Sequence, residues 1–255
     1  MNSIIETAVQ RRDDAPQPVP TVKLMQSSDM ERWDNFVLTC PDATFFHRAG
    51  WQTVIERAFG HKTWFMYAET NGNIEGVLCL AEINSVLFGH SLISLPFCVY
   101  GGIAAVNEQS RAVLNRRAQE LADELKVGHL EYRNMMPRHP DWKSKDLYVT
   151  FRKEILPSVD ENMNAIPRKQ RAMVRKGIKH GLQSSLDDHL DRFFTAYSTS
   201  VHRLGTPVFS KKYFQLLKQT FGKDCEIQTI TNEDRIIASV MSFYFRDEVI
   251  PYYGG

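Results

Sequence analysis

The sequence predicts an α/β (α+β) fold with two tandem domains, each a mixed, mostly antiparallel sheet flanked by helices. Three observations predict it. The chain has 255 residues, 43% hydrophobic and 11% aromatic, which can fill the core of one large domain or two ordinary ones. Amphipathic helical segments alternate with pairs of short apolar strands. The order of these segments in the first half of the chain returns in the second half.

The first domain is predicted over residues 21–155, after a flexible lead-in at 1–20 that ends in APQPVP. Hydrophobic periodicity locates its elements, and the turn sequence Asn71-Gly72 predicts a hairpin. The expected helices cover 30–37, 49–58 and 108–126, and the expected strands cover 21–25, 63–69, 74–83, 91–102, 129–134 and 147–152.

A connecting helical segment is predicted at 156–185, and it holds the basic stretch IPRKQRAMVRKGIKHGL at 166–182. Pro167 suits the first turn of a helix, and Gly181 suits the left-handed residue after its end. The stretch has no acidic residue and six basic ones: Arg168, Lys169, Arg171, Arg175, Lys176 and Lys179. This local charge favours a phosphate-bearing ligand, and the alternative is a solvated surface helix.

The apolar residues of this stretch recur at helical spacing, which predicts a narrow stripe that docks on a core. They are Met173, Val174, Ile178 and Leu182.

The second domain is predicted over residues 186–255. The expected helices cover 187–200 and 213–222, and the expected strands cover 225–231, 236–245 and 249–255. Residues of matched type lie 162 positions apart, from Trp51 and Tyr213 onward, which indicates an internal duplication. The Tyr-Gly-Gly at 100–102 and at 253–255 match at an offset of 153, so the first copy should have a longer hairpin. The first copy continues past this point, and we therefore expect the second domain to be C-terminally incomplete.

Composition excludes several classes. The net charge of +1 argues against a general nucleic-acid coat, and no DNA partner is expected. The four cysteines are scattered without metal-ligand spacing, so no metal is expected. No signal peptide or membrane span is recognisable, which indicates a cytoplasmic protein. The sequence shows no Ser/His/Asp arrangement, P-loop or GxGxxG motif, so neither a covalent mechanism nor a permanently bound cofactor is expected.

Four further residues are candidates, and two of them have a plainer alternative. His202 is a candidate general base, or else a capping or surface histidine. Arg203 and Lys211 are candidates to extend the basic groove. Tyr253 precedes two glycines at a strand end, where a donor chain can approach the backbone, or else packs as an ordinary core aromatic.

Four segments together resemble the FemAB family of acyl- and peptidyltransferases: SLPFCVYGG, IPRKQRAMVRKGIKHGL, SVHRLGTPVFSKKYF and IASVMSFYFRDEVIPYYGG. The resemblance covers nearly the whole chain beyond about residue 20 and is strongest to the FemAB-like proteins associated with exosortase/PEP-CTERM systems. It implies two tandem GNAT-like domains and transfer of an acyl or aminoacyl group to an amine. In this family the segment between the domains contributes to the substrate groove. We therefore expect a shared phosphate-binding role for five of its basic residues: Arg168, Lys169, Arg171, Arg175 and Lys176.

The resulting hypothesis is a cytoplasmic N-acyltransferase, with the inner face of the membrane as a further expected location. The co-substrate would be acyl-CoA or aminoacyl-tRNA, and the acceptor an amine on a cell-envelope precursor or glycan. Its partners would be a phosphorylated small molecule or nucleotide-sugar, with tRNA as a further candidate. The alternative is a non-enzymatic binder of RNA or anionic polysaccharide that uses the helix at 166–182.

Overall fold

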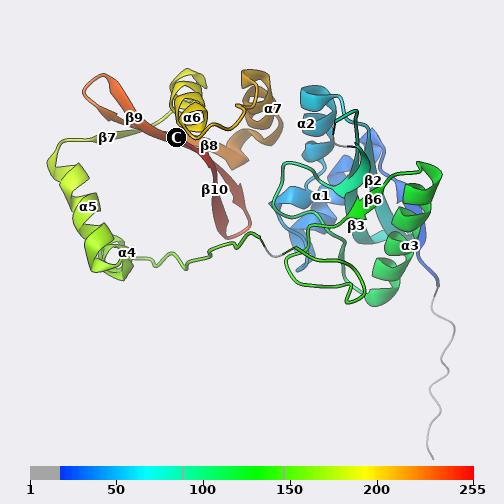
Figure 1. Cartoon of the computed structure of the whole chain (residues 1–255). Helices are drawn as coiled ribbons and strands as arrows, with labels where there is room; N and C mark the ends of the chain where they lie inside the picture. Colours follow the sequence, from blue (N-terminus) through cyan, green and yellow to red (C-terminus); the bar gives the residue numbers. More distant parts are fainter. Residues whose placement is uncertain (1–17, 88, 146) are drawn as a thin grey trace, which may run out of the picture.

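The computed structural model describes residues 18–87, 89–145 and 147–255, and Figure 1 shows its two sheets joined through helices. Most of the predicted lead-in lies outside the described residues. The first sheet has the order β1-β2-β3-β4-β6, with β5 also pairing with β3. Its strands are β1 (Thr21–Leu24), β2 (Thr63–Thr70), β3 (Asn73–Ser85), β4 (Gly89–Ser94), β5 (Ala104–Ala105) and β6 (His129–Glu131). All of its pairings are antiparallel except that of β4 with β6.

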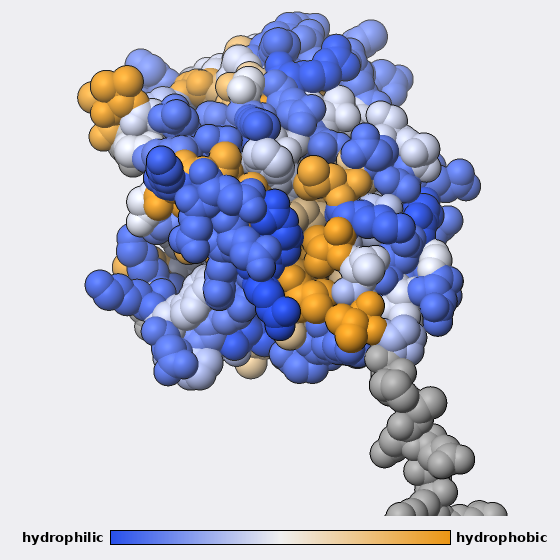
Figure 2. Space-filling view, turned by 90° about the vertical axis from the view of Figure 1, so that its right-hand side faces the viewer, coloured by the Kyte–Doolittle hydropathy of each residue, from blue (hydrophilic) through white to orange (hydrophobic). Residues whose placement is uncertain are grey.

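Helices cover both faces of the first sheet. Helices α1 (Met30–Thr39) and α2 (Gly50–Phe59) lie on the face toward the second half of the chain, and α3 (Glu108–Glu124) lies on the other face. Leu114, Ala118 and Leu121 of α3 pack on the sheet, and polar residues occupy most of the helix's remaining surface. Figure 2 shows this side of the molecule, where hydrophilic side chains cover most of the surface with smaller apolar areas between them.

The second sheet has the order β10-β9-β8-β7 and is antiparallel throughout. Its strands are β7 (Gln183–Leu186), β8 (Cys225–Asn232), β9 (Arg235–Phe245) and β10 (Glu248–Gly254). Helices α6 (Asp191–Arg203) and α7 (Lys211–Phe221) cover one face. Strand β7 was not expected, and the predicted boundary between residues 185 and 186 falls inside it. Two further helices, α4 (Val159–Ala165) and α5 (Arg168–Lys179), precede this sheet.

The predicted duplication is confirmed by strand register. Thr63 lies opposite Ala81 in the first sheet, and Cys225 lies opposite Phe243 in the second, each 162 positions later. The offset also relates β1 to β7, because Thr21 faces Glu69 as Gln183 faces Thr231. Even the β-bulge is repeated, after Ala68 in one hairpin and after Ile230 in the other. Each hairpin therefore has the same backbone plan.

The predicted match of Tyr100 with Tyr253 is wrong. Ala104 lies opposite Val77, and Gly255 exchanges backbone hydrogen bonds with Ser239, the residue 162 positions after Val77. Ala104 therefore corresponds to Gly255. The first copy leaves the sheet after β4, makes a loop that contains Tyr100, and rejoins it as β5, whereas β10 stays on the sheet with one bulge.

The two copies share one hydrophobic core through matched aromatic contacts. The ring centroids of Phe59 and Tyr213 lie 5.0 Å apart, and those of Trp51 and Phe221 lie 5.2 Å apart, both with planes tilted by 51°. Because these positions are related by the offset of 162, the contact is a pseudo-two-fold one, as in an isologous dimer interface. Arg246 of the second copy also donates hydrogen bonds to the Val37 and Cys40 carbonyls near the end of α1.

Two predictions about the connecting region are wrong. Residues 147–152 form no strand, because this segment has no partner strand among the described residues. The apolar stripe of α5 docks on no core: Met173, Val174 and Ile178 are all exposed. Figure 1 shows the reason, since α4 and α5 lie at the periphery, joined to the first domain by an extended segment.

Candidate functional site

A cavity of about 120 Å³ opens where the parallel strands β4 and β6 end. In open sheets the chains diverge beyond the carboxyl ends of parallel strands, and ligands bind in the resulting crevice. Residues from the two loops that follow these strands form much of its wall. The lining comprises Pro41, Asp42, Thr44, His47, Tyr100, Gly102, Ile103, Arg133, Asn134, Met135, Met136 and Arg138.

The first loop leaves the sheet through an unusual backbone. Leu95 and Phe97 have φ values of +54° and +67°, in the left-handed region that bulky residues rarely adopt. Such conformations persist only where the surroundings hold them, and they often occur beside functional sites. Leu95 is fully buried, and the Phe97 ring stacks on Phe59 at 4.2 Å. The shared core therefore holds the loop that lines the cavity.

Close approach at two glycines fixes the two walls of the cavity. A Cβ on Gly102 would lie 1.8 Å from Oδ1 of Asn134, in the loop after β6. A Cβ on Gly101 would lie 2.7 Å from the Ser94 carbonyl oxygen. The absence of a Cβ at Gly101 and Gly102 thus leaves room for the Ser94 carbonyl and the Asn134 side chain. The neighbour that requires glycine at position 102 is the Asn134 side chain.

His47 anchors the same wall. Its Nδ1 accepts from the Thr44 backbone N–H at 3.0 Å, so the ring proton lies on Nε2, which donates to the Gly102 carbonyl at 2.8 Å. Burial lowers the pKa of His47, which keeps the imidazole neutral. With both nitrogens occupied, His47 positions the loop and has no free nitrogen for proton transfer.

Arginines give the cavity its charge. Arg133 is held by Glu131 at 2.8 Å and by the Cys98 carbonyl at 2.7 Å. Arg138 is nearly half exposed and reaches Asp42 only at 3.5 Å, while Arg111 takes the other oxygen of Asp42. The Arg138 guanidinium therefore has donors left for an anionic group. Sequence analysis missed Arg133 and Arg138, since they are single arginines in the loop after β6 and meet Asp42 and the Cys98 carbonyl only in space.

The extended segment after the cavity ties it to the second copy. The Tyr100 hydroxyl donates to Thr150 Oγ1 at 2.7 Å. Arg152 pairs with Glu248 of β10 at 2.8 Å, and one of its nitrogens lies 3.9 Å from the Met135 sulfur. The cavity therefore lies beside the junction of the two copies.

The structure does not bring the predicted site residues to this cavity. The five phosphate-binding candidates lie on α5, where Arg171 donates to Asn164 at 2.9 Å and the others are exposed. Among the described residues, none of these cations forms an ion pair with a carboxylate.

The remaining candidates are also dispersed. His202 and Arg203 are exposed at the end of α6, and Lys211 pairs with Asp191. Tyr253 lies in the shared core, with its hydroxyl 2.7 Å from that of Tyr213, and burial raises its pKa. α5 stands apart from α6 and α7 in Figure 1.

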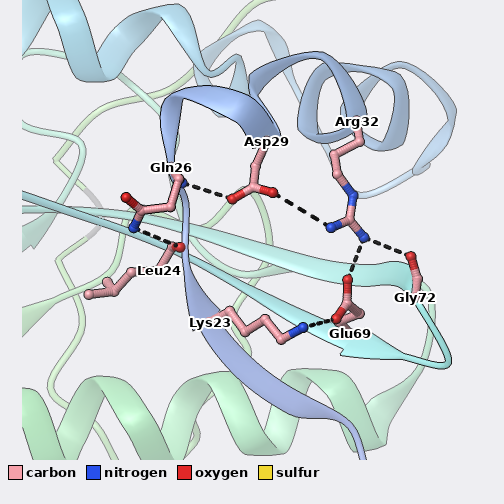
Figure 3. Close-up of polar contacts among 7 residues, drawn as sticks. All are labelled: Lys23, Leu24, Gln26, Asp29, Arg32, Glu69 and Gly72. Carbon is pink, nitrogen blue, oxygen red and sulfur yellow. Dashed lines mark hydrogen bonds and ion pairs between the residues drawn. The ribbon is translucent and has the colours of Figure 1, made fainter.

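A second charged cluster lies at the bulge of the first hairpin. Figure 3 shows Glu69 between Lys23 and Arg32, which both bond its carboxylate, and Arg32 also donates to the Gly72 carbonyl at 2.7 Å. The hydrogen bond from Lys23, followed by that from Arg32, lowers the pKa of Glu69. Asp29 lies 3.6 Å from Arg32 and accepts from the Gln26 backbone N–H. The charges of this cluster satisfy one another, which indicates a structural role.

The described residues contain no group of three or more His, Cys, Asp or Glu side chains arranged to hold a metal. The four cysteines are free and buried. Within the same residues, none of the helices has the length and apolar character needed to cross a bilayer.

Comparison with known proteins gives a match in structure and none in sequence. No protein-family model and no curated protein sequence matches the chain. The crystal structure of FemX is similar to 92% of this chain and is itself covered to 80%, with a TM-score of 0.63 and 15% identity. A GNAT family acetyltransferase from Staphylococcus aureus subsp. aureus USA300_TCH1516 is 12% identical and has a TM-score of 0.35, over 54% of this chain and 100% of its own. The chain therefore has the fold of FemX, which confirms the predicted fold of tandem GNAT-like domains.

Proposed function

We propose that this chain is an N-acyltransferase of the FemAB type. The observation that carries the proposal is the likeness of fold to FemX, which covers 92% of the chain and therefore both copies. The reaction would move an acyl or aminoacyl group from acyl-CoA or aminoacyl-tRNA to an amine on a cell-envelope precursor or glycan. The finer link to exosortase-associated proteins rests on the four sequence segments alone.

The cavity would bind an anionic group of one substrate. Arg138 has donors free for a carboxylate or phosphate, while Arg133 and His47 hold the walls in place. Amide formation breaks the ester or thioester bond of the donor and forms a C–N bond, and the amine loses a proton to solvent or to the leaving group. Holding the two substrates in contact supplies much of such a rate. We assign no catalytic base, since His47 is committed and His202 lies on the exposed end of α6.

The cations of α5 are proposed as a phosphate-binding group for the co-substrate. CoA, tRNA and nucleotide-sugars all carry phosphates, and guanidinium and ammonium groups bind them in water. The absence of carboxylate partners for these cations among the described residues supports this role. Arg203 lies at the end of α6, apart from α5, and would make a separate contact, whereas Lys211 is already paired with Asp191.

A transfer assay tests the proposal. The protein would be incubated with labelled acetyl-CoA or alanyl-tRNA and with a UDP-linked amino-sugar peptide, and amide product would be measured. Arg138→Ala should lower kcat/KM by about tenfold or more, which corresponds to about 1.4 kcal/mol of lost transition-state stabilisation. Arg116→Ala, on the exposed side of α3, is the matched control and should leave the rate unchanged. Equal rates in the two variants would contradict the role of the cavity, and no product with any donor would contradict the proposed activity.

The alternative function is polyanion binding without turnover. The cations of α5, which pair with no carboxylate in the part of the chain that the structure describes, favour it. In that case binding to tRNA or heparin should fall by about 10³-fold or more between about 50 and 200 mM salt, if some six phosphates are neutralised. Saturable stabilisation by acetyl-CoA at the higher salt concentration would exclude it.

A further inference from the structure

The segment from residue 147 to residue 189 contains no buried residue. It nevertheless carries large apolar side chains, and two aromatic ones are almost fully exposed, Tyr148 at 93% and Phe151 at 92%. Folded proteins usually bury such side chains or cover them with a partner. The exposed apolar residues of this segment are Leu147, Tyr148, Val149, Phe151, Ile155, Val159, Met173, Val174, Ile178 and Leu186.

Helix α5 separates its apolar and basic residues onto two sides. With about 100° between successive residues, Met173, Val174 and Ile178 fall within an arc of roughly 140°. The six cations occupy the other side of the helix, with Arg171 and Lys169 at its two borders. Met173 is 65% exposed and Ile178 is 66% exposed, so the apolar side faces solvent. Such an arrangement is typical of helices that lie in a membrane interface.

The charge of the whole segment agrees with this reading. Residues 147–182 contain eight Lys and Arg and three Glu and Asp, because Arg152 and Lys153 add to the six cations of α5. Of the three acidic residues, Glu154 lies in the extended segment and Asp160 and Glu161 in the first turn of α4. A surface with excess positive charge and exposed apolar side chains complements an anionic lipid surface in both respects.

We propose that residues 147–182 form a docking surface for an anionic lipid bilayer, with α5 lying flat in the interface. The lipid phosphates would meet the cations, and Met173, Val174 and Ile178 would enter the apolar region below them. RNA or a free phosphate would use the cations but would leave the apolar side in water. Docking on a bilayer does not rest on the proposed acyl transfer, but it assigns to the bilayer the same α5 cations that the proposed function assigns to the co-substrate. Because Thr150 bonds Tyr100, docking would also place the cavity beside the bilayer.

Vesicle co-sedimentation tests the proposal with the full chain. The vesicles would contain phosphatidylcholine alone or with about one third phosphatidylglycerol, at about 0.1 M salt. We expect binding only to the anionic vesicles. Met173→Ser with Ile178→Ser should weaken it by about tenfold or more, because two apolar side chains no longer leave water. Each cation removed, as in Arg175→Ala or Lys176→Ala, should weaken it about fivefold.

The control is Val86→Ser with Leu87→Ser, an exposed apolar pair in the first domain, which should bind vesicles like the parent. Binding of tRNA and acetyl-CoA would be measured on the same proteins. The M173S/I178S variant should keep that binding, whereas the cation variants should lose part of it. Vesicle binding that survives M173S/I178S, equal binding to neutral vesicles, or no vesicle binding at all would overturn the proposal. If the parent protein binds anionic vesicles but shows no acyl transfer, the proposed function fails and the docking proposal stands.

Discussion

The two copies share a hairpin plan but differ in how much of each sheet is covered. In the first copy both faces of β2 and β3 are buried, since Met66, Ala68, Leu78 and Leu80 pack under α3. At the matched positions of the second copy stand Gln228, Ile230, Val240 and Ser242. Of these only Ser242 is buried, and no helix follows β10 among the described residues as α3 follows β5. The strand sequences reflect this difference. Strand β3 contains a continuous apolar run, whereas apolar and polar residues alternate in β8.

The β-bulge that the two hairpins share shows the same difference between the copies at a single position. It holds Glu69 in the first copy, where Lys23 and Arg32 bond the carboxylate. In the second copy the corresponding residue is Thr231, and the residue corresponding to Lys23 is Ser185. The backbone irregularity is therefore independent of the ion pairs. Features that both copies need, register and the shared core, are common to them, and the outer surfaces differ.

The largest expected effect is at the pseudo-two-fold contact. Trp51→Ala should destabilise the protein by about 3–5 kcal/mol, because a fully buried ring with four aromatic neighbours is lost. Tyr213→Ala, at the matched position, should cost a similar amount. Urea unfolding would measure both, with the exposed Val86→Ala as the control. A decrease in the free energy of unfolding of less than about 1 kcal/mol in either variant would show that Trp51 and Tyr213 are not equivalent.

An intermediate effect should separate the two sheets directly. Leu78→Ala should cost about 2–5 kcal/mol, since its side chain is buried under α3. Val240→Ala, 162 positions later, should cost less than about 1 kcal/mol because its side chain is partly in water. Thermal unfolding of the two variants gives the comparison. Equal losses would mean that the outer face of the second sheet is covered in solution.

The smallest expected effect concerns pH. His47 corresponds to Phe209 by the offset, so only the first copy holds a titratable group here. Burial lowers the pKa of His47 below its usual value of 6.5, so the unfolded chain binds a proton more readily than the folded one. Stability should therefore fall as pH drops below about 6.5, by at most about 1.4 kcal/mol per pH unit from this group.

His47→Gln keeps a donor toward Gly102 and does not titrate. The variant should lose stability less steeply than the parent between about pH 6.5 and 5, although its stability at neutral pH should be lower. His61 and His139 also have pKa values lowered by burial, so part of the slope should remain. Parallel slopes in the two proteins would show that His47 is not neutral in the fold.

Much of the fold follows from the sequence because it is encoded locally. Asn71 has φ +50° and Gly72 has φ +83°, as a tight hairpin turn requires, and Gly60 ends α2 in the left-handed region, as its position after the helix indicates. The two wrong predictions about the connecting region have a common cause. The strand expected at 147–152 and the docking expected for α5 were inferred from apolar pattern alone, and pattern does not specify whether a partner surface exists.

The cavity could not be found in this way. Its key contacts join Arg138 to Asp42, Gly102 to Asn134 and His47 to Gly102, each across many residues of sequence. Of these residues only Gly102 lies in a segment that the sequence singles out, Tyr100-Gly101-Gly102, and their meeting depends on where β4 and β6 end. Strand β7 was missed for a different reason, since Gln183–Leu186 is short and mostly polar and is fixed only by pairing with β8.

The shared core also has a consequence for synthesis on the ribosome. Phe45 and Trp51 pack against Phe243, which is translated more than a hundred residues after β6. At about 5–20 residues per second, the first copy waits on the order of ten seconds with this aromatic face open. A chaperone that binds apolar surface has that interval in which to act. Ribosome-bound chains stalled near residue 160 should therefore bind chaperones that recognise apolar surface, and chains extended by a linker beyond residue 255 should bind them less.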